Sequence, residues 1–416
     1  MHTDGENFLC LSVFICVPTT FIYLRASNPE LRNMKVTRIK IDNFKSLVDF
    51  ELKLSKFACL VGLNGSGKST VLQCFDFLAQ QCKGDIQAWL DIRHWSAADL
   101  NSRLSHKSNI DFTVDLKDNA GQKMGWSCSF NRKELRCTRE SIAVNGRQVL
   151  KVEDGYFSVS VEGIPSSQKH IDFFYQGSIL SQLKEAHLPR CLLELKHSFL
   201  HIHALDMLSP ELLRQRTRFS AGGLGIGGES LSAFLHEIDL KKRVEITNKL
   251  KKAYPQLLNI DVDSLRSGWK KLYITEKFSG KRMSTEARHV SDGLLRMLAI
   301  FTQLIDEKSF VLLDEIENGI NPELIELLID TLVQSPHQVM ITTHSPLILN
   351  YMDDYIAQHG VVYLYKSPEG FTRSIPFFSI PSMAEKLTVM GPGEVYEDTH
   401  LPELQDEINA IVNRDS

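Results

Sequence analysis

Residues 57–70, FACLVGLNGSGKST, decide the fold of this chain. The apolar run Phe57–Val61 predicts a buried strand, and apolar residues at helical spacing from Val71 onward predict an amphipathic helix. The turn between them fits G-x-x-x-x-G-K-[ST], whose glycines let backbone N–H groups converge on phosphate oxygens at a helix N-terminus. The expected phosphate-binding residues are Gly62, Leu63, Asn64, Gly65, Ser66, Gly67, Lys68, Ser69 and Thr70. The stretch therefore predicts a site for a nucleoside triphosphate.

Two side chains of this loop carry specific expectations. Lys68 should reach the β- and γ-phosphates, and Ser69 should bind Mg²⁺. The alternative is an ordinary glycine turn before a helix. A chance match somewhere in a chain of this length has a frequency on the order of one or two in a hundred. The strand and helix on either side make the alternative weak.

The composition is that of a globular protein with a large core. Apolar residues make up 43% and charged residues 24% of the 416 positions. The formal net charge of -4 excludes a polycation built for nucleic acid, and a local basic patch remains open. The eight cysteines are scattered and form no C-x-x-C. They predict reduced thiols in a cytoplasmic protein and disfavour a disulfide frame or a zinc site.

The first 33 residues differ from the rest of the chain. Residues 8–24 are mostly apolar and reach the short limit for a membrane span. The segment before them carries Asp4 and Glu6 in place of the basic residues of a signal peptide. Met34 directly precedes the first convincing strand pattern. We expect residues 1–33 to lie outside the folded domain, with a membrane anchor as the less favoured interpretation.

Residues 34–416 are expected to form an α/β domain. Alternating apolar positions in residues 35–54 predict two antiparallel strands before the phosphate-loop strand. Short β-rich pieces follow, with Asn145-Gly146 as a hairpin turn and residues 170–175 as a further buried strand. The expected subdivisions are an inserted antiparallel subdomain at about 82–170, a helical lobe at about 177–305, and a hairpin and tail at 351–416.

Three patterns have an ordinary explanation that we prefer. His201 and His203 form H-x-H, which suits two metal ligands, but an exposed strand face explains it better. The G-x-G-x-x-G at 223–228 follows no hydrophobic strand and therefore fails the context of a dinucleotide-binding fingerprint. The basic residues of 241–252 predict a solvated helix face, with nucleic-acid contact as the weaker interpretation.

A second block of motifs supplies acids and a histidine at strand ends. A buried strand at 309–313 ends in Asp314 and Glu315, which could hold Mg²⁺ through a water and polarise an attacking water. A strand at 338–343 ends before His344, which could donate to a γ-phosphate oxygen. Ser291, Asp292 and Gly293 begin an apolar helix and could bind an anion there, or could form a simple N-cap.

The order of these motifs resembles a known group. The phosphate loop, S-D-G-x-x-R, L-L-D-E-x-E-N-G and T-T-H-S-P resemble the ABC-type ATPases of the SMC/RecF/OLD group. The nearest resemblance is to the AAA family ATPases that are predicted bacterial proteins with a single short chain and no nuclease domain. K-I-D-N-F-K-S-L, I-H-A-L-D, G-G-E-S-L-S-A-F-L and M-G-P-G-E-V resemble that branch too, so the resemblance runs from about residue 35 to 395.

The resemblance implies a P-loop NTPase head of the ABC type, with a mixed central sheet, an antiparallel β-subdomain and a helical lobe. It implies ATP and Mg²⁺ as ligands and two copies joined head to tail by ATP. The roles it implies are as follows: Lys68, Glu315 and His344 catalytic; Ser69 and Asp314 on Mg²⁺; Asn318 and Gly319 in the D-loop; Ser291, Asp292 and Gly293 as the signature acting on the other copy; and Gln176 as the Q-loop candidate. Leu294 and Asn321 depart from residues common in the branch, and neither is a catalytic acid.

Other ATPase classes fit less well. A transporter subunit is disfavoured by the S-D-G signature and by the 223 residues between Lys68 and Ser291. Only 70 residues follow Pro346, without a strand-end D-x-D, which disfavours an intrinsic nuclease. The sequence contains no sustained heptad repeat, so a long coiled coil is not predicted.

We expect a Mg²⁺-dependent ATPase that forms a homodimer around ATP. Family analogy places it in DNA transactions such as repair, or in antiphage defence with a separately encoded effector, and allows contact with DNA or RNA. The alternative is an ATP-dependent switch or scaffold with little turnover. A membrane-anchored or transporter-type ATPase subunit is the third interpretation, and a membrane partner is not expected.

Overall fold

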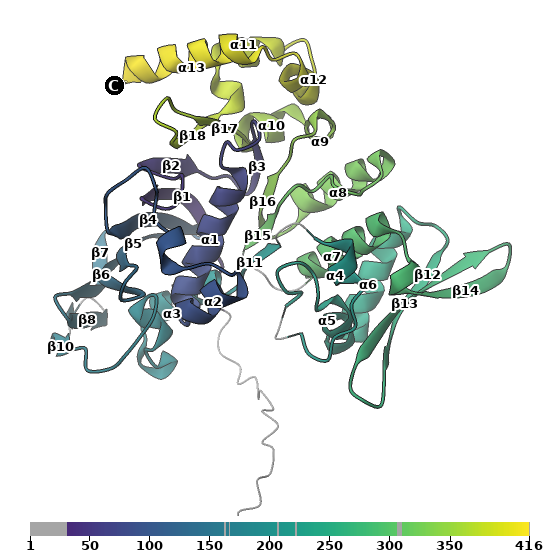
Figure 1. The fold of residues 1–416 in the computed structure, drawn as a ribbon, viewed down its shortest axis with the longest axis horizontal. Coiled ribbons are helices and arrows are strands. Elements are labelled where there is room, and N and C mark those ends of the chain that lie inside the picture. Colours follow the sequence, from purple (N-terminus) through teal and green to yellow (C-terminus); the bar gives the residue numbers. More distant parts are fainter. Residues whose placement is uncertain are drawn as a thin grey trace, which may run out of the picture. The chain divides into compact units, whose positions relative to one another are not determined.

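The computed structural model describes residues 31–415 apart from 162–163, 166, 206–207, 221–222 and 306–309 (Figure 1). The chain divides into two compact units, residues 1–31 and residues 32–416. The predictions for residues 1–33 fall almost entirely outside the described residues. Within the described part, no helix is long and apolar enough to cross a membrane.

The central sheet has six strands in the order β11-β15-β16-β3-β17-β18. All neighbouring pairs are parallel except β17 and β18, which confirms the predicted mixed sheet of an α/β fold. The strands are β3 (Phe57–Val61), β11 (Ile202–Leu205), β15 (Phe310–Leu313), β16 (Gln338–Thr342), β17 (Val361–Lys366) and β18 (Thr372–Pro376). Every residue of β3, β15 and β16 is buried, as expected for strands covered on both faces.

Strand β3 contributes to a separate hydrophobic core on each face of this sheet. Phe57, Cys59 and Val61 belong to one core, which includes the packed face of helix α7 (Asp292–Ile305). Ala58 and Leu60 belong to the other core, with helix α1 (Lys68–Lys83). Since side chains alternate along a strand, a five-residue apolar run is enough to anchor both cores.

A second, antiparallel sheet has the order β10-β8-β7-β6-β5-β4-β1-β2, with β9 paired to β8. Its strands are β1 (Met34–Asp42), β2 (Phe50–Lys53), β4 (Asn109–Asp118), β5 (Lys123–Asn131), β6 (Arg136–Val144), β7 (Arg147–Glu153), β8 (Tyr156–Val161), β9 (Ile164–Pro165) and β10 (Lys169–His170). The strands expected between 82 and 170 therefore extend the sheet that β1 and β2 begin. Asn145 and Gly146 both have positive φ, 48° and 80°, as a two-residue hairpin turn requires.

Two expectations for this sheet are wrong. Residues 171–175 form no strand, because Tyr175 is instead anchored by its hydroxyl, which donates to the carbonyl of Cys137 at 2.7 Å. The structure also joins Cys128 and Cys137 by a disulfide between β5 and β6, where reduced thiols were expected. Pairing of the two strands brings these cysteines together, and their spacing of nine residues gives no C-x-x-C signal. The free cysteines among the described residues are Cys59, Cys74, Cys82 and Cys191.

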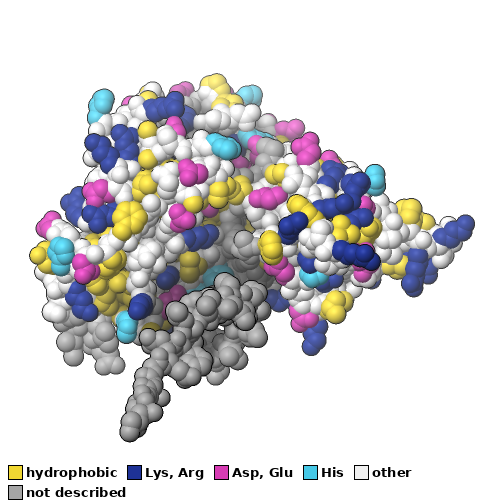
Figure 2. All heavy atoms as spheres, turned by 60° about the horizontal axis from the view of Figure 1, so that its bottom comes forward, with side chains coloured by type: hydrophobic (Ala, Val, Ile, Leu, Met, Phe, Trp, Pro, Cys, Tyr) yellow, Lys and Arg dark blue, Asp and Glu magenta, His cyan; other side chains and the backbone are white. Residues whose placement is uncertain are grey.

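The lobe expected to be helical contains a third sheet. Helices α3 (Arg190–Leu200), α4 (Pro210–Leu213), α5 (Leu231–Glu237), α6 (Leu240–Lys251) and α7 lie in this part of the sequence. Between α6 and α7 the chain forms the antiparallel strands β12 (Leu257–Ser264), β13 (Lys270–Phe278) and β14 (Lys281–Glu286). On the face shown in Figure 2, Lys and Arg side chains gather over this part of the chain.

In the chain, the remaining helices follow α1 or one of the central strands β15, β16 and β18. They are α2 (Ile86–Ile92), α8 (Pro322–Gln334), α9 (Pro346–Asn350), α10 (Asp354–Gly360), α11 (Pro381–Lys386), α12 (Pro392–Glu397) and α13 (Leu401–Asp415). The tail residues 390–395, MGPGEV, begin α12, which packs on α9 because Gly393 leaves room for the backbone of Pro346.

Gln338, at the start of β16, ties the two large sheets together. Its side-chain amide is buried and makes three hydrogen bonds to backbone groups of the antiparallel part. It accepts from the N–H of Val36 at 2.9 Å and donates to the carbonyls of Val36 at 2.7 Å and Ser55 at 3.0 Å. Three buried backbone groups therefore depend on one side chain.

We predict that Gln338→Leu lowers the free energy of unfolding by about 2–3 kcal/mol, because these backbone groups lose their partners. Thermal unfolding of the purified protein measures the change. The control is Gln405→Leu on α13, a half-buried glutamine whose amide donates to the side chain of Asn409, one turn along the same helix; it should change stability by less than about 0.5 kcal/mol. Equal effects of the two variants would contradict a bridging role for Gln338.

Candidate active site

Residues 62–67 form the phosphate loop, and its first and last positions require glycine. Gly62 and Gly67 have φ values of 142° and 111°, which side chains rarely adopt. A Cβ added at Gly62 would lie 2.2 Å from the carbonyl oxygen of Leu364, and one at Gly67 would lie 2.3 Å from Thr372 Oγ1. The loop therefore packs directly on the hairpin of β17 and β18.

Thr372 supports the loop from behind. Its hydroxyl donates to the carbonyl of Ser66 at 2.9 Å and accepts from Lys366 Nζ at 3.0 Å. The hydroxyl of Ser66 is itself buried and has no hydrogen-bond partner. Since buried polar groups are rarely left unpaired, this hydroxyl is free to serve a ligand of the loop.

Lys68 begins α1 with its ammonium group inside the loop. Nζ donates to the carbonyls of Gly62 at 2.8 Å and Leu63 at 3.1 Å and lies 3.4 Å from His344 Nδ1. Burial lowers the pKa of Lys68, and the neighbouring carboxylates of Asp314, Glu315 and Glu317 raise it again. A compact cation with carboxylates on one side suits a phosphate group on the other.

Asp314 and Glu315 follow β15 and are both held by Thr342 on the adjacent strand β16. The Thr342 hydroxyl donates to Asp314 Oδ1 and accepts from the N–H of Glu315 at 2.9 Å. Glu315 has a φ of 46°, which turns its side chain out of the strand path. Sequence analysis missed Thr342, because its role depends on the pairing of β15 with β16.

The carboxylate of Glu315 is oriented from two sides. Asn318 Nδ2 donates to Oε2 at 2.6 Å, and His344 Nε2 lies 3.5 Å from Oε1. The loop of His344 is fixed in turn by Glu317, whose Oε1 accepts from the N–H of His344 at 2.7 Å. The structure thus brings together Lys68, Asp314, Glu315 and His344, all predicted site residues, and adds Glu317 as a support.

The signature turn lies at the other side of the D-loop, residues 317–321. Ser291 and Asp292 are exposed at the start of α7, and Asp292 pairs with the guanidinium of Arg214. Gly293 packs on the D-loop, since a Cβ there would lie 2.9 Å from the carbonyl oxygen of Gly319. In residues 31–415, gaps excepted, no hydrogen bond or ion pair connects Ser291–Gly293 to the phosphate loop.

Gln176 is not part of this site. Its Oε1 accepts from the N–H of Gln87, and its carbonyl lies beside Gly84, just after the C-terminus of α1. Lys68 is at the opposite end of this 16-residue helix, which is about 24 Å long. The structure therefore does not bring Gln176 to the phosphate loop, and its Q-loop assignment stays a prediction.

The H-x-H pattern forms no metal site in the described residues. His201 Nδ1 bonds the carbonyl of His197 at 2.7 Å, and the side chain of His203 lies outside the described residues. Nowhere in the described part do three His, Cys, Asp or Glu side chains cluster as a metal site would require.

Ser69, the predicted Mg²⁺ ligand, is exposed at the start of α1. It directly follows Lys68, on which the charge of Asp314 acts.

A pocket of about 620 Å³ lies beside α1 and is lined by residues that include Lys45, Ser46 and Trp95. Lys45 Nζ donates to Gln73 Oε1 on α1 at 2.8 Å and lies 3.3 Å above the ring of Trp95. Ser46 Oγ lies 2.8 Å from Thr372 Oγ1, the hydroxyl that supports the phosphate loop. The pocket therefore adjoins the support of the phosphate loop, and its volume falls in the range of small-molecule sites, with Trp95 in a mostly polar lining.

We predict that Thr342→Val slows nucleotide hydrolysis about 10–100-fold, because both acids lose their common support. Thr342→Ser keeps the hydroxyl and should retain most of the activity. Turnover at saturating nucleotide measures both variants, and equal losses for Val and Ser would contradict the role of the hydroxyl.

Comparison with solved structures identifies the same fold elsewhere. An SMC head bound to the C-winged helix domain of ScpA matches with a TM-score of 0.52 and 13% identity, covering 82% of this chain and 96% of that chain. An SMC head domain with an extended coiled coil, bound to the C-terminal domain of ScpA and derived from Pyrococcus furiosus, gives 0.50 and 12%, covering 85% and 100%. No curated protein gives a match.

A family model reaches the same conclusion from sequence. The model described as "AAA domain, putative AbiEii toxin, Type IV TA system" matches residues 57–88 and 83–350, which contain the phosphate loop, both acids and His344. The resemblance stated from the motifs is thereby confirmed, and the fold is that of SMC head domains. The chain belongs to the AAA-domain family that this model describes.

Proposed function

We propose that this protein is a Mg²⁺-dependent ATPase whose working form is a homodimer with ATP held between two copies. One observation carries the proposal. Lys68, Glu315 and His344 meet in one chain, while the signature residues Ser291 and Asp292 are exposed and contact none of them. Because a two-fold dimer presents the same surface twice, the signature of each copy can complete the site of the other.

The residues present fit a nucleotide and its metal. The buried unpaired hydroxyl of Ser66 and the positive-φ glycines form a cradle for phosphate oxygens. The pocket of Lys45 and Trp95 would receive the base. Mg²⁺ takes few protein ligands and keeps several waters, so Ser69 and Asp314 suffice to hold it. Bound there, Mg²⁺ would neutralise charge on the phosphates.

The chain's own groups account for water activation. Glu315 is the general base, since its carboxylate is oriented by Asn318 and His344 and can accept a proton from the attacking water. Lys68 supplies a positive charge where the transferred phosphate becomes more negative. The positive φ of Glu315, held by Thr342, directs the base to one place.

We predict that Glu315→Gln traps the dimer. The amide keeps the shape of the site but cannot accept the proton, so ATP should bind without being hydrolysed. Sizing of this variant should show a shift from monomer to dimer on addition of ATP and Mg²⁺. Glu315→Gln combined with Lys68→Ala is the control and should stay monomeric with ATP. A variant that remains monomeric in every nucleotide condition would refute the sandwich.

The alternative function is an ATP-dependent switch or scaffold with little turnover. This alternative also requires the ATP-dependent dimer, but it does not require Glu315 to act as a general base. Steady-state hydrolysis distinguishes the two functions. If the wild-type chain hydrolyses ATP no faster than Glu315→Gln, with DNA, RNA and partner protein present, the enzyme is excluded and the switch remains.

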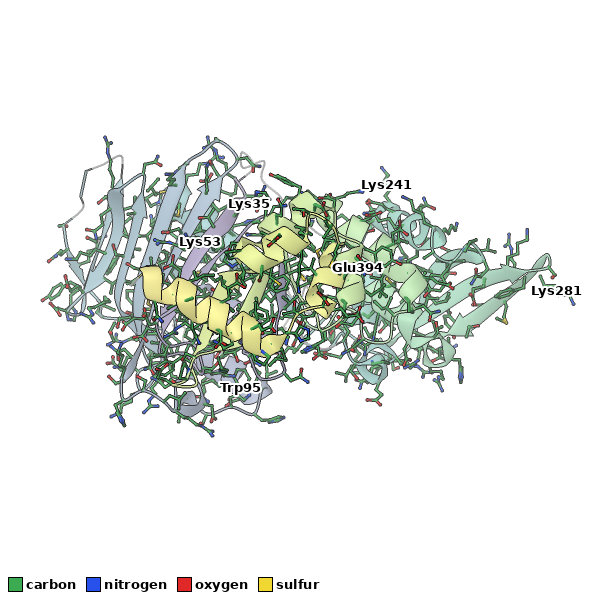
Figure 3. The ribbon with its side chains drawn as sticks, turned by 90° about the horizontal axis from the view of Figure 1, so that it is seen from above. Lys35, Lys53, Trp95, Lys241, Lys281 and Glu394 are labelled. Carbon is green, nitrogen blue, oxygen red and sulfur yellow. A yellow bond between two sulfur atoms is a disulfide. The ribbon has the colours of Figure 1, made fainter. Side chains whose placement is uncertain are left out.

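We place the activity in DNA transactions or antiphage defence, with a separately encoded effector. The charge of the lobe supports a nucleic-acid partner. Residues 209–290 contain 16 Lys and Arg against 9 Asp and Glu, although the whole chain has a net charge of -4. Lys281 lies at the far end of the β13–β14 hairpin, where Arg282 is its neighbour (Figure 3). Such a surplus on one lobe is the electrostatic footprint of nucleic-acid binding.

We predict that Lys241→Gln, Lys281→Gln and Arg282→Gln together weaken oligonucleotide binding at low salt and reduce the salt dependence of the affinity by about 2–3 released ions. Fluorescence anisotropy over a salt series measures both quantities. The control is Lys35→Gln with Lys53→Gln, a half-buried lysine of β1 and an exposed lysine of β2; this double variant should bind normally. If the salt dependence of the affinity is unchanged in the triple variant, the lobe does not bind the nucleic acid.

A further inference from the structure

Arg296 belongs to the S-D-G-x-x-R motif but has no part in the function described so far. It lies one turn after Gly293 on α7 and therefore shares a helix face with it. Unlike Ser291 and Asp292, which are exposed, Arg296 is half-buried. Its Nε is fully buried and has no hydrogen-bond partner. A buried guanidinium nitrogen without a partner requires an explanation, because it costs desolvation energy.

The side chain of Arg296 lies against the D-loop of its own chain. A Cβ added at Gly319 would lie 3.2 Å from Arg296 Nε and 3.5 Å from its Cδ. On the preceding turn of α7, a Cβ added at Gly293 would lie 2.9 Å from the carbonyl oxygen of the same Gly319. Gly319 also has a φ of 68°, so two separate reasons require glycine there. One D-loop residue is thus packed against two successive positions of the signature helix.

Arg296 also faces the catalytic acids. It lines a small cavity with Asp314 and Glu315, closed by apolar side chains that include Leu208, Ile300 and Ile316. Burial lowers the pKa of Arg296, and the charges of Asp292 and Glu315 raise it again. Because the guanidinium stays protonated in proteins, a fixed positive charge lies near Glu315 in surroundings that screen it weakly.

We propose that Arg296 is a positioning residue that links the signature turn to Glu315 within one chain. It holds the D-loop at Gly319 and supplies the charge that Glu315 faces, so that α7, the D-loop and Asn318 act as one unit. The proposal rests on the proposed function, because there the signature turn contacts the nucleotide of the second copy. Arg296 then connects the nucleotide held by the partner copy to the base that acts in its own chain.

The alternative is that Arg296 only fills space with its aliphatic stem. Two substitutions separate the roles. Arg296→Met keeps the stem and removes the charge, whereas Arg296→Lys keeps a charge and removes the planar fork. If the residue only fills space, Met and Lys should behave alike. If it positions Glu315 through charge, Lys should recover activity that Met loses.

The test measures ATP hydrolysis by the full chain over a range of ATP concentrations. For Arg296→Met we expect kcat to fall about tenfold or more while KM for ATP changes less than about twofold, because nucleotide binding is untouched. Arg296→Lys should recover at least about a third of the wild-type kcat. Arg243→Met is the matched control: Arg243 on α6 is also partly buried with an unpartnered Nε, and its replacement should leave kcat unchanged.

A second readout separates this proposal from the dimer itself. Arg296→Met in the Glu315→Gln background should still form the ATP-dependent dimer by sizing. A dimer with normal kcat in Arg296→Met, or equal kcat losses in Met and Lys, overturns the positioning role. Absence of any dimer in Glu315→Gln alone overturns the proposed function instead, and the kcat comparison of Met with Lys still decides whether Arg296 acts on Glu315.

Discussion

The two hydrogen bonds of the Thr342 hydroxyl are the interaction on which the rest of the site depends. One reaches Asp314 and the other holds the backbone of Glu315 in a conformation that non-glycine residues rarely adopt. The bonds exist because β15 and β16 are parallel neighbours, so their carboxyl ends meet at one edge of the sheet. Strand β3 pairs with β16 on its other side, which brings the phosphate loop to the same edge. The sheet order thus determines which side chains meet.

Charged groups of opposite sign lie together at this edge of the sheet, and two buried polar atoms there have no hydrogen-bond partner. Lys68 lies near three carboxylates that raise its pKa, and its ammonium group bonds the carbonyls of its own loop. The hydroxyl of Ser66 and Oε2 of Glu317 are buried without partners. A phosphate group would satisfy the first and give Lys68 a second anion. On the far side of the D-loop, Gly293 and Arg296 connect the same edge to the exposed signature turn, which is the surface available to a second copy.

The sequence alone predicted the elements that carry strong local patterns. The phosphate loop, the strand before Asp314 and the Asn145-Gly146 turn each combine a hydrophobic period with a fixed turn chemistry. Thr342 escaped prediction because its role depends on strand pairing that no local pattern encodes. Spacing across the inserted strands also does not determine which end of α1 Gln176 reaches, so its position had to come from the structure. The sheet of β12–β14 was missed because only two residues of β12, two of β13 and none of β14 are buried, which weakens the alternation.

The central claim is that each ATP site needs the phosphate loop of one copy and the signature of another. Mixing two inactive variants tests it most directly. Lys68→Ala destroys the loop, and Ser291→Arg blocks the signature. In a mixed dimer one site combines both defects and the other is intact, so mixing should restore ATP hydrolysis that neither variant shows alone, up to about half of the wild-type rate per mixed dimer. Activity that stays at the level of the separate variants would contradict a site shared between copies.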